Sequence, residues 1–417
     1  MSARRKALVI GGSLGGLFAA NLLARAGWEV ELFERVGEAL AGRGAGIVTH
    51  DELFAVIRRT GAVIDETIGC ETNSRVTLDR DGRVIAEMPL HQVLTAWGRL
   101  YRLLKDVFPA KQYHFDKSLV RCEQDAGSVT AHFADGSHAT GEILIGADGI
   151  RSTVRAQFFP QARPAYAGYL AWRGLADEMA VKEETRRVLS DRMGFCLPPG
   201  EQMLTYLVAG SDNTTRIGER RFNFVWYRPA DQKTELRALL TDVDGRYYEQ
   251  NIPPARIRRE VIAAIHATAE KLLAPPFVDV VRAAAEPLFQ PIYDLDSDEL
   301  VCGRVALLGD AAFVARPHVG LGVTKAAGDA AALVDALAEH PHDQAVALRQ
   351  YAASRLRFGK SIVAHARLLG LGIGAPATGA AQGALVDYLR RPDVVMREIA
   401  VPDWADRSFA LRQLQVT

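Results

Sequence analysis

The sequence predicts a mixed α/β protein, in which a parallel βαβ layer is interrupted by a second β-sheet and followed by helices. Three observations predict this class. Residues 6–34 read as strand, helix and strand. Two later segments, 141–148 and 303–310, each contain a buried strand that is followed by a glycine and an aspartate. Residues 164–230 and the hairpin 75–88 read as further strands.

Composition sets the broad class of protein. The 417 residues are 48% hydrophobic and 24% charged, with 50 basic and 50 acidic side chains. That balance is typical of a globular chain with two domains or one elaborated domain, and it does not favour nucleic acid as a partner. No run of about 18 apolar residues is present, so we expect no membrane span. Because glycines break the apolar stretch near the start and no small-residue cleavage site follows, we expect a cytoplasmic protein.

The cysteines and histidines indicate no metal site. The four cysteines are far apart and form no C-x-x-C pair, which favours free thiols over a disulfide. The ten histidines form no H-E-x-x-H motif.

The opening strand–helix–strand unit can be followed residue by residue. "KALVI" is a short buried strand, and "LGGLFAANLLARAG" has helical apolar spacing with Gly27 at the position of a C-cap. "WEVELF" alternates as a second strand and runs into Glu34. The unit has the length of a dinucleotide-binding βαβ motif.

The turn "VIGGSLGG" between the first strand and the helix matches two motifs. Gly11, Ser13 and Gly15 spell G-x-S-x-G, the nucleophile elbow of a hydrolase. Gly11, Ser13 and Gly16 nearly spell G-x-G-x-x-G, with serine in place of the middle glycine. An elbow takes part of its oxyanion hole from an earlier strand, and ten residues leave no room for one. We therefore interpret Ser13 as a phosphate-binding residue.

Glu34 follows Gly16 by 18 residues, where an acid can accept both hydroxyls of an adenosine ribose. Its charge would repel a 2′-phosphate, which argues against NADP at this site. The turn alone does not separate NAD from FAD.

Two later segments bear on that choice. In "GEILIGADGIRSTVR" (141–155), Asp148 stands at the carboxyl end of a buried strand, where open α/β sheets bind ligands. In "GRVALLGDAAFVARPHVGLGVTKAAGDAAALVDAL" (303–337), Asp310 ends another strand, and a glycine-rich loop leads to a helix that begins near Gly322.

These three segments, in this order, resemble the single-component FAD-dependent aromatic hydroxylases of the para-hydroxybenzoate hydroxylase type. With "GAGIV" (44–48), "YAGYLAWRG" (166–174) and "FNFVWY" (222–227), the chain is most similar to the branch that hydroxylates dihydroxypyridines. The resemblance implies a Rossmann-like FAD-binding domain interleaved with a β-sheet substrate domain, followed by C-terminal helices. It covers about residues 5–365.

The resemblance assigns cofactor roles by position. Gly11, Ser13, Leu14 and Gly16 would surround the FAD pyrophosphate, and Glu34 with Arg35 would meet the adenosine ribose. The remaining residues would contact the adenine, the pyrophosphate and nicotinamide path, the ribityl chain or the flavin ring: Arg43, Val48, Arg99, Val120, Asp148, Asp310, Pro317, Gly320, Leu321, Gly322, Val323 and Thr324.

Several positions depart from the pattern of the family. Phe313 stands where many relatives carry a histidine, and Thr324 where many carry an asparagine. Trp97 takes the place of an arginine that opens a helix in many relatives. Arg99, two positions on, is read either as its substitute or as a solvated helix arginine.

The predicted organisation has three parts. The FAD-binding domain comprises 1–72, 96–163 and 290–345, the substrate domain comprises 73–95 and 164–289, and 346–417 form a C-terminal helical region. Residues 254–286 read as helical and 343–371 as a long helix. The alanine- and glycine-rich stretch 370–386 is read either as a loose loop or as the contact of a homodimer.

The implied reaction is carried by the flavin. NADH or NADPH reduces FAD, O₂ adds to give a flavin hydroperoxide, and one oxygen is transferred to a small, electron-rich aromatic or N-heteroaromatic ring. The alternative is an FAD-dependent oxidoreductase of the same fold without oxygen transfer.

The candidates for acid–base catalysis are His50, Tyr206 and Tyr227. A histidine can take a phenolic proton near neutral pH, but His50 can equally be a partly exposed turn residue that caps the helix "DELFAVIRR". Tyr227 is also read as a core residue. Trp172 and Trp226 are read either as stacking partners of the substrate or as core aromatics, and His318 either approaches the flavin or hydrogen-bonds within its loop.

Overall fold

The computed structural model describes residues 5–38, 46–374 and 380–401. Arg43 therefore lies outside the described residues, as does the segment 375–379 of the predicted loop or dimer contact. Two large sheets and one small sheet make up the strands.

A six-stranded sheet forms the first layer, in the order β16-β17-β10-β1-β2-β6. Its central strands are parallel, as expected for buried strands that are joined by helices. The strands are β1 (Lys6–Ile10), β2 (Glu29–Phe33), β6 (Tyr113–His114), β10 (Ile143–Gly146), β16 (Val301–Cys302) and β17 (Val305–Leu307).

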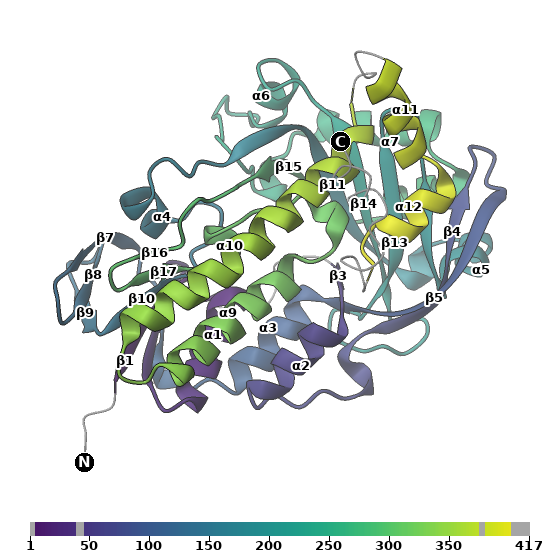
Figure 1. Cartoon of the computed structure of the whole chain (residues 1–417). Helices are drawn as coiled ribbons and strands as arrows, with labels where there is room; N and C mark the ends of the chain where they lie inside the picture. The colour runs from purple at the N-terminus through teal and green to yellow at the C-terminus, as the bar shows by residue number, and fades with distance from the viewer. Residues whose placement is uncertain (1–4, 39–45, 375–379, 402–417) are drawn as a thin grey trace.

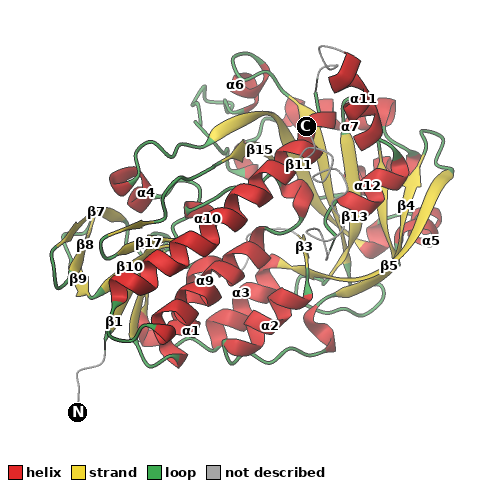
Figure 2. Cartoon of the chain, viewed as in Figure 1, coloured by secondary structure: helices red, strands yellow, loops and turns green. Residues whose placement is uncertain are grey.

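Helices gather beside this sheet (Figure 2). Helix α9 contacts α1, α2 and α10, and α10 is the long helix that runs diagonally across Figure 1. Their bounds are α1 (Leu14–Arg25), α2 (Asp51–Arg59), α3 (Trp97–Asp106), α9 (Gly322–Glu339) and α10 (Gln344–Leu369). The structure thus confirms the predicted first βαβ unit and the long helix predicted over 343–371.

The second layer is an eight-stranded sheet in the order β15-β11-β14-β13-β12-β4-β5-β3. Most of its neighbouring strands are antiparallel, although β12 pairs with β4 in parallel. The strands are β3 (Gly46–Val48), β4 (Cys70–Leu78), β5 (Val84–Ala96), β11 (Ala165–Asp177), β12 (Arg192–Cys196), β13 (Gln202–Val208), β14 (Arg221–Pro229) and β15 (Leu288–Asp294).

This sheet separates two cores. Tyr169 and Tyr227 belong to the core shared with the first layer, whereas Trp172 and Trp226 belong to a second core on the opposite face. The separation follows from the two-residue period of a strand, which sends neighbouring side chains to opposite faces. The second core lies beneath α5 (Glu183–Leu189), α6 (Glu235–Leu239), α7 (Arg259–Leu272) and α8 (Pro275–Ala283).

A three-stranded sheet of β7 (Leu119–Gln124), β8 (Val129–Phe133) and β9 (His138–Gly141) completes the strands, with α4 (Thr153–Phe158) against β7. At the other end of the chain, α12 (Pro392–Glu398) contacts β4 and β5, next to α11 (Ala380–Leu389). Arg75 of β4 donates to the carbonyl oxygens of Met396 and Ala400, both at 2.8 Å. The C-terminal helices are thereby attached to the large sheet.

Three segments differ from the predicted organisation. The sequence assigns 46–48, 70–72 and 290–294 to the cofactor domain, but they are strands of the large sheet, because β3 and β4 pair with β5 and β15 pairs with β11. Residues 254–286 are helical as predicted and form two helices, since Pro275 and Pro276 cannot continue α7 and instead open α8. The other domain boundaries stay predictions.

The four cysteines are free thiols, and three of them are buried. No group of side chains suited to a metal ion occurs among the described residues. Over the same residues, no helix is long and apolar enough to cross a membrane.

Candidate active site

The turn between β1 and α1 requires glycine at two positions. Gly11 has φ +106°, and a Cβ there would lie 2.7 Å from the carbonyl carbon of Ala147. A Cβ on Gly16 would overlap the carbonyl oxygen of Gly11. Close approach of the turn to its neighbours therefore depends on the absence of side chains, as it does where backbone surrounds a pyrophosphate.

Ser13 occupies the N-cap position of α1 in an extended conformation. Its carbonyl oxygen accepts from the amide of Leu17 at 2.9 Å, but its hydroxyl makes no capping bond. Among the described residues no histidine or carboxylate bonds to Ser13 Oγ, so the partners that activate a nucleophile do not accompany it. Leu14 follows it and is buried.

Glu34 follows directly after β2, and its carboxylate fixes the glycine turn by hydrogen bonds. Its carboxylate accepts from the amides of Gly12 at 2.8 Å and Val36 at 3.0 Å. The hydroxyl of Tyr113 donates to the Gly12 carbonyl at 2.9 Å. A carboxylate has about four acceptor sites, so two remain for ribose hydroxyls. The exposed Arg35 comes next.

Asp148 lies beside Gly11, since a Cβ on Gly11 would be 2.9 Å from the Asp148 Cα. Its Oδ2 accepts from the amides of Thr153 at 2.7 Å and Val154 at 3.2 Å and so caps α4. Its Oδ1 is covered and has no partner within the described ranges. Burial raises the pKa of Asp148, although these hydrogen bonds oppose the shift.

Asp310 belongs to a charged cluster at the start of α9. Lys325 Nζ lies 4.0 Å from Asp310 and 3.7 Å from Asp329. Asp329 also accepts from the Gly309 amide at 3.0 Å and from Arg355 at 2.7 Å. The Asp310 side chain is 56% exposed whereas that of Lys325 is 1% exposed, so the cluster presents one carboxylate outward. The residues predicted from the sequence do not include Lys325, Asp329 and Arg355, although Lys325 and Asp329 stand at the i,i+4 spacing of a helical ion pair.

The loop before α9 has the geometry expected of a close backbone approach. Pro317 begins a short 3₁₀ turn that ends at Gly320, whose φ is +66°. A Cβ on Gly320 would lie 2.7 Å from the Cβ of Ala400 and 3.6 Å from that of Val48. Leu321 is buried and provides no side-chain cap to the helix. The free amides of the first turn, which holds Gly322, Val323 and Thr324, favour negative charge.

The structure brings His50 to this loop. Its Nδ1 lies 2.8 Å from Thr324 Oγ1, and the residue is buried. His50 does occupy the N-cap position of α2, but its side chain makes no capping bond. The interpretation of His50 as a partly exposed capping residue is therefore wrong, while its catalytic role stays a prediction.

Tyr227 meets the same loop from the large sheet. Its ring centroid lies 4.1 Å from that of His318, whose Nε2 lies 2.8 Å from the Tyr169 hydroxyl. Burial lowers the pKa of His318 to about 3 and raises that of Tyr227 to about 12. Burial also raises the pKa of Tyr206, whose ring lies against Gly46. The two tyrosines and the histidine are therefore neutral at physiological pH.

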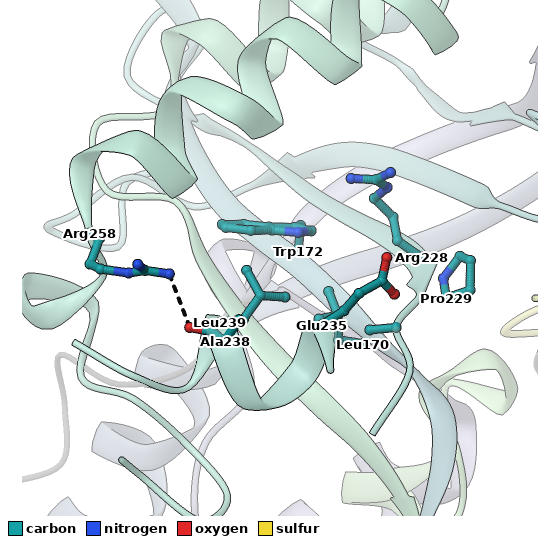
Figure 3. A pocket seen from close by; sticks show the side chains of 9 residues that line it. Leu170, Trp172, Arg228, Pro229, Glu235, Ala238, Leu239 and Arg258 are labelled. Carbon is teal, nitrogen blue, oxygen red and sulfur yellow. Dashed lines mark hydrogen bonds between the residues drawn. The ribbon is translucent and has the colours of Figure 1, made fainter. Parts of the chain in front are cut away.

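Trp172 and Trp226 lie on the opposite face of the sheet, so they are core aromatics. Trp226 Nε1 donates to Glu201 at 2.7 Å. A cavity of about 290 Å³ opens on this face, with Trp172 across it and Arg258 donating to the Ala238 carbonyl at its margin (Figure 3). This cavity is separated by the sheet from Tyr206 and Tyr227.

Two other predicted cofactor residues can be placed. Arg99 donates to Thr67 Oγ1 at 2.7 Å and approaches Asp65 at 3.4 Å, so it holds the turn 65–67. The Val120 side chain is exposed. The register of β7 shifts between Leu119 and Arg121, which makes Val120 a bulge residue and leaves it unpaired in the ladder. The contact of the Val120 backbone with adenine stays a prediction.

Comparisons with known proteins agree with the geometry. Residues 166–294 match the protein family described as FAD binding domain-like. The chain is 32% identical to 2,6-dihydroxypyridine 3-monooxygenase of Paenarthrobacter nicotinovorans over 84% of this chain and 87% of that protein. The structure of 2,6-dihydroxypyridine-3-hydroxylase from Arthrobacter nicotinovorans aligns with a TM-score of 0.82 at 31% identity, covering 87% of this chain and 91% of that one. Klebsiella pneumoniae HpxO complexed with FAD and uric acid aligns with a TM-score of 0.75 at 26% identity, covering 93% and 92%.

These relationships confirm the predicted fold class, FAD as the cofactor with NAD(P)H as the reductant typical of such enzymes, and ring hydroxylation rather than oxidoreduction without oxygen transfer. The glycine turn and the loop before α9 fit a bound dinucleotide, because Gly11, Gly16 and Gly320 allow close backbone packing where a Cβ would clash, and both segments lead into helix N-termini, which favour negative charge. The chain belongs to the family of FAD-dependent aromatic monooxygenases.

Proposed function

We propose that the substrate is a small ring that carries at least one hydroxyl group, of the phenol or hydroxypyridine type. One observation carries this proposal: two buried, neutral tyrosines lie in the core between the two layers, with Tyr227 against His318 of the loop before α9 and Tyr206 against Gly46 of β3. Buried hydroxyls orient a planar polar ring and help to exclude bulk water. The 2,6-dihydroxypyridine 3-monooxygenase at 32% identity supports the same class.

The geometry supports the following cofactor roles. Gly11, Ser13 and Gly16 bind the pyrophosphate, Glu34 accepts from the ribose, and Asp310 accepts from the ribityl chain. When bound, FAD accepts a hydride from NAD(P)H and activates O₂ for transfer to the ring.

His50 takes the proton of the ring hydroxyl. Its bond to Thr324 fixes the imidazole beside the loop that lines the flavin. Removal of that proton makes the ring more nucleophilic, which is the step that a protein base can accelerate. Tyr206 and Tyr227 remain protonated and donate to the substrate. The free thiols of the four cysteines support the cytoplasmic location predicted from the sequence.

The proposal is tested by screening phenols and hydroxypyridines for stimulation of NAD(P)H oxidation, with ¹⁸O₂ as the oxygen source. We expect one group of rings to stimulate oxidation and to yield a product that contains one ¹⁸O atom. Matched rings without a hydroxyl group serve as the control. Stimulated oxidation without ¹⁸O in any product would support a reductase instead, and stimulation by the control rings would contradict the substrate class.

A further inference from the structure

The large sheet presents an arginine to the substrate side of the molecule. Arg173 lies in β11 opposite Val225 of β14. Val225 and Tyr227 belong to the core shared with the first layer, whereas Trp172 and Trp226 face away. By alternation, Arg173 shares its face with Tyr227. Its charge acts on both Tyr206 and Tyr227, which places the guanidinium near the two phenols.

Among the described residues, Arg173 has no partner for its charge. In the parts of the chain that the structure describes, no carboxylate, carbonyl or hydroxyl bonds to its guanidinium, and its Nε is fully covered. Other arginines of the same sheet region are paired: Arg220 lies 2.6 Å from Glu178, and Arg228 lies 3.0 Å from Glu201. A half-buried cation without a partner is costly, so its presence indicates a ligand that supplies the negative charge.

Asn223 adds a second donor on the same face. It lies in β14 opposite Tyr206 of β13 and is buried. Its Oδ1 accepts from the amide of Gly46 at 3.1 Å, which fixes the orientation of the side-chain amide. Its Nδ2 is covered and has no acceptor within the described part of the chain. Gly46 begins β3, which leads through Val48 to His50, so this donor lies at the junction with the cofactor layer.

We propose that Arg173 and Asn223 together bind an anionic oxygen of the substrate, so that the enzyme selects the ring as an anion. This inference rests on the proposed function and narrows its substrate class. A guanidinium and an amide NH₂ are both donors, and only an acceptor satisfies both. The anionic oxygen belongs either to a deprotonated ring hydroxyl or to a carboxylate on the ring.

The groups around Arg173 do not compete for this role. Tyr206 on β13 and Tyr227 on β14 stay protonated, because burial outweighs the effect of the arginine on their pKa values. His318, whose ring packs on Tyr227, is neutral because burial lowers its pKa to about 3. Leu288, opposite Arg173 on β15, carries no charge. These groups keep their charge near neutral pH, so the loss of the proton of the ring hydroxyl, to solvent or to His50, governs binding as the pH changes.

The test compares two probes by the change in flavin absorbance of the FAD-loaded enzyme. 2,6-Dihydroxypyridine can form an oxyanion, and 2,6-difluoropyridine has a similar shape but cannot. We expect Arg173→Gln to lower the affinity for the dihydroxy probe roughly 10- to 100-fold and the affinity for the difluoro probe less than about twofold. Arg173→Lys restores part of the affinity. Arg228→Gln, on the opposite face, leaves both affinities unchanged, and FAD content reports that each variant is folded.

The wild-type enzyme gives a test that needs no variant. Its affinity for 2,6-dihydroxypyridine should rise with pH until the probe itself is ionised, while the affinity for 2,6-difluoropyridine stays flat. 6-Hydroxynicotinate distinguishes the source of the anion: a carboxylate held by Arg173 gives an affinity independent of pH, and a ring oxyanion gives the rise.

Three outcomes would overturn the inference. If Arg173→Gln weakened binding of the dihydroxy and difluoro probes equally, the role of the arginine would be structural. If it weakened binding of neither probe, the arginine would not contact the ring. If both variants of Arg173 lose FAD, the wild type decides. Anion selection would be excluded if its affinities for the dihydroxy probe and for 6-hydroxynicotinate did not change with pH and its affinity for the difluoro probe were the same. If the wild type hydroxylates the dihydroxy probe and replacement of Arg173 changes no affinity, only this inference fails. If the wild type binds none of the probes, the proposed substrate class fails as well.

Discussion

Replacing Gly16 by alanine should abolish FAD binding, whereas replacing the adjacent Gly15 should not. The two glycines distinguish the two motifs found in the turn, because Gly15 belongs to the hydrolase pattern and Gly16 to the dinucleotide pattern. A Cβ on Gly16 would lie 3.0 Å from the carbonyl carbon of Gly11 and closer still to its oxygen. A Cβ on Gly15 would meet only Leu308 Cδ1 at 3.3 Å and Ala326 Cβ at 3.6 Å.

The magnitude follows from these distances. In Gly16→Ala the start of α1 must move roughly 1.5 Å from the turn before the new Cβ and the Gly11 oxygen reach van der Waals separation. Such a shift costs about 1–3 kcal/mol of folding stability and moves the amides that face the pyrophosphate. In Gly15→Ala the contact is with the end of a flexible leucine, and alanine favours the helix by up to about 1 kcal/mol.

The assay is titration of the apoprotein with FAD, together with thermal unfolding of the apoprotein. We expect Gly16→Ala to lose at least roughly 100-fold in FAD affinity and several degrees in Tm. Gly15→Ala should keep both values close to the wild type. Full FAD affinity in Gly16→Ala would refute the dinucleotide interpretation of the turn, and loss of FAD in both variants would show that the turn tolerates no side chain at either position.

Four further predictions concern single residues. Ser13→Gly should retain FAD and Ser13→Ala should lose only a few-fold in affinity, since the hydroxyl makes no capping bond to α1; esterase activity that depends on Ser13 would contradict this. Glu34→Arg should weaken FAD binding at least roughly tenfold, measured by the same titration, because the acceptor of the Gly12 amide and of the ribose is lost. His50→Ala should bind and reduce FAD normally but release more hydrogen peroxide per NAD(P)H, less so at high pH where the substrate ionises unaided; unchanged coupling would remove His50 as the base. The folded protein keeps His318 neutral down to about pH 3, whereas the unfolded chain binds a proton near 6.5, so stability should fall as the pH drops below 6.5; His318→Gln should flatten that fall in urea denaturation, and an unchanged slope would contradict it.

The elements that hydrophobic periodicity defines were predictable. The first strand and helix, the two buried strands before Asp148 and Asp310, and α10 each have a clear apolar pattern, so local sequence determines their type. The boundaries between layers were not predictable to the same degree. The segment 46–48 is too short for a period, and only its pairing with β5 assigns it to the large sheet.

Some residues of the candidate site were likewise predictable from local sequence and others were not. Glycines such as Gly11 and Gly16 were identifiable because a motif fixes their spacing. The bond between His50 and Thr324 joins residues 274 positions apart, so no local pattern reports it. The contact of Tyr227 with His318 likewise depends on the docking of the sheet against the loop. The sequence shows Arg173 only as part of the motif "YAGYLAWRG", because its lack of a partner among the described residues is a property of the three-dimensional structure.

Some polar atoms of the site have hydrogen-bond partners in the protein and others have none. Glu34 fixes the glycine turn through Gly12, and Asp329 fixes the turn before Asp310 through Gly309, so the backbone that faces the cofactor is held by its own hydrogen bonds. An atom that binds a ligand needs a donor or acceptor site that no protein group occupies, because such a group would compete with the ligand. Among the described residues, Asp148 Oδ1 lies beside the glycine turn without a partner, and Arg173 Nε lies without one in the sheet. Arg220 and Arg228 of the same sheet region have carboxylate partners, and this difference is the physical reason to assign Arg173 to the substrate rather than to the fold.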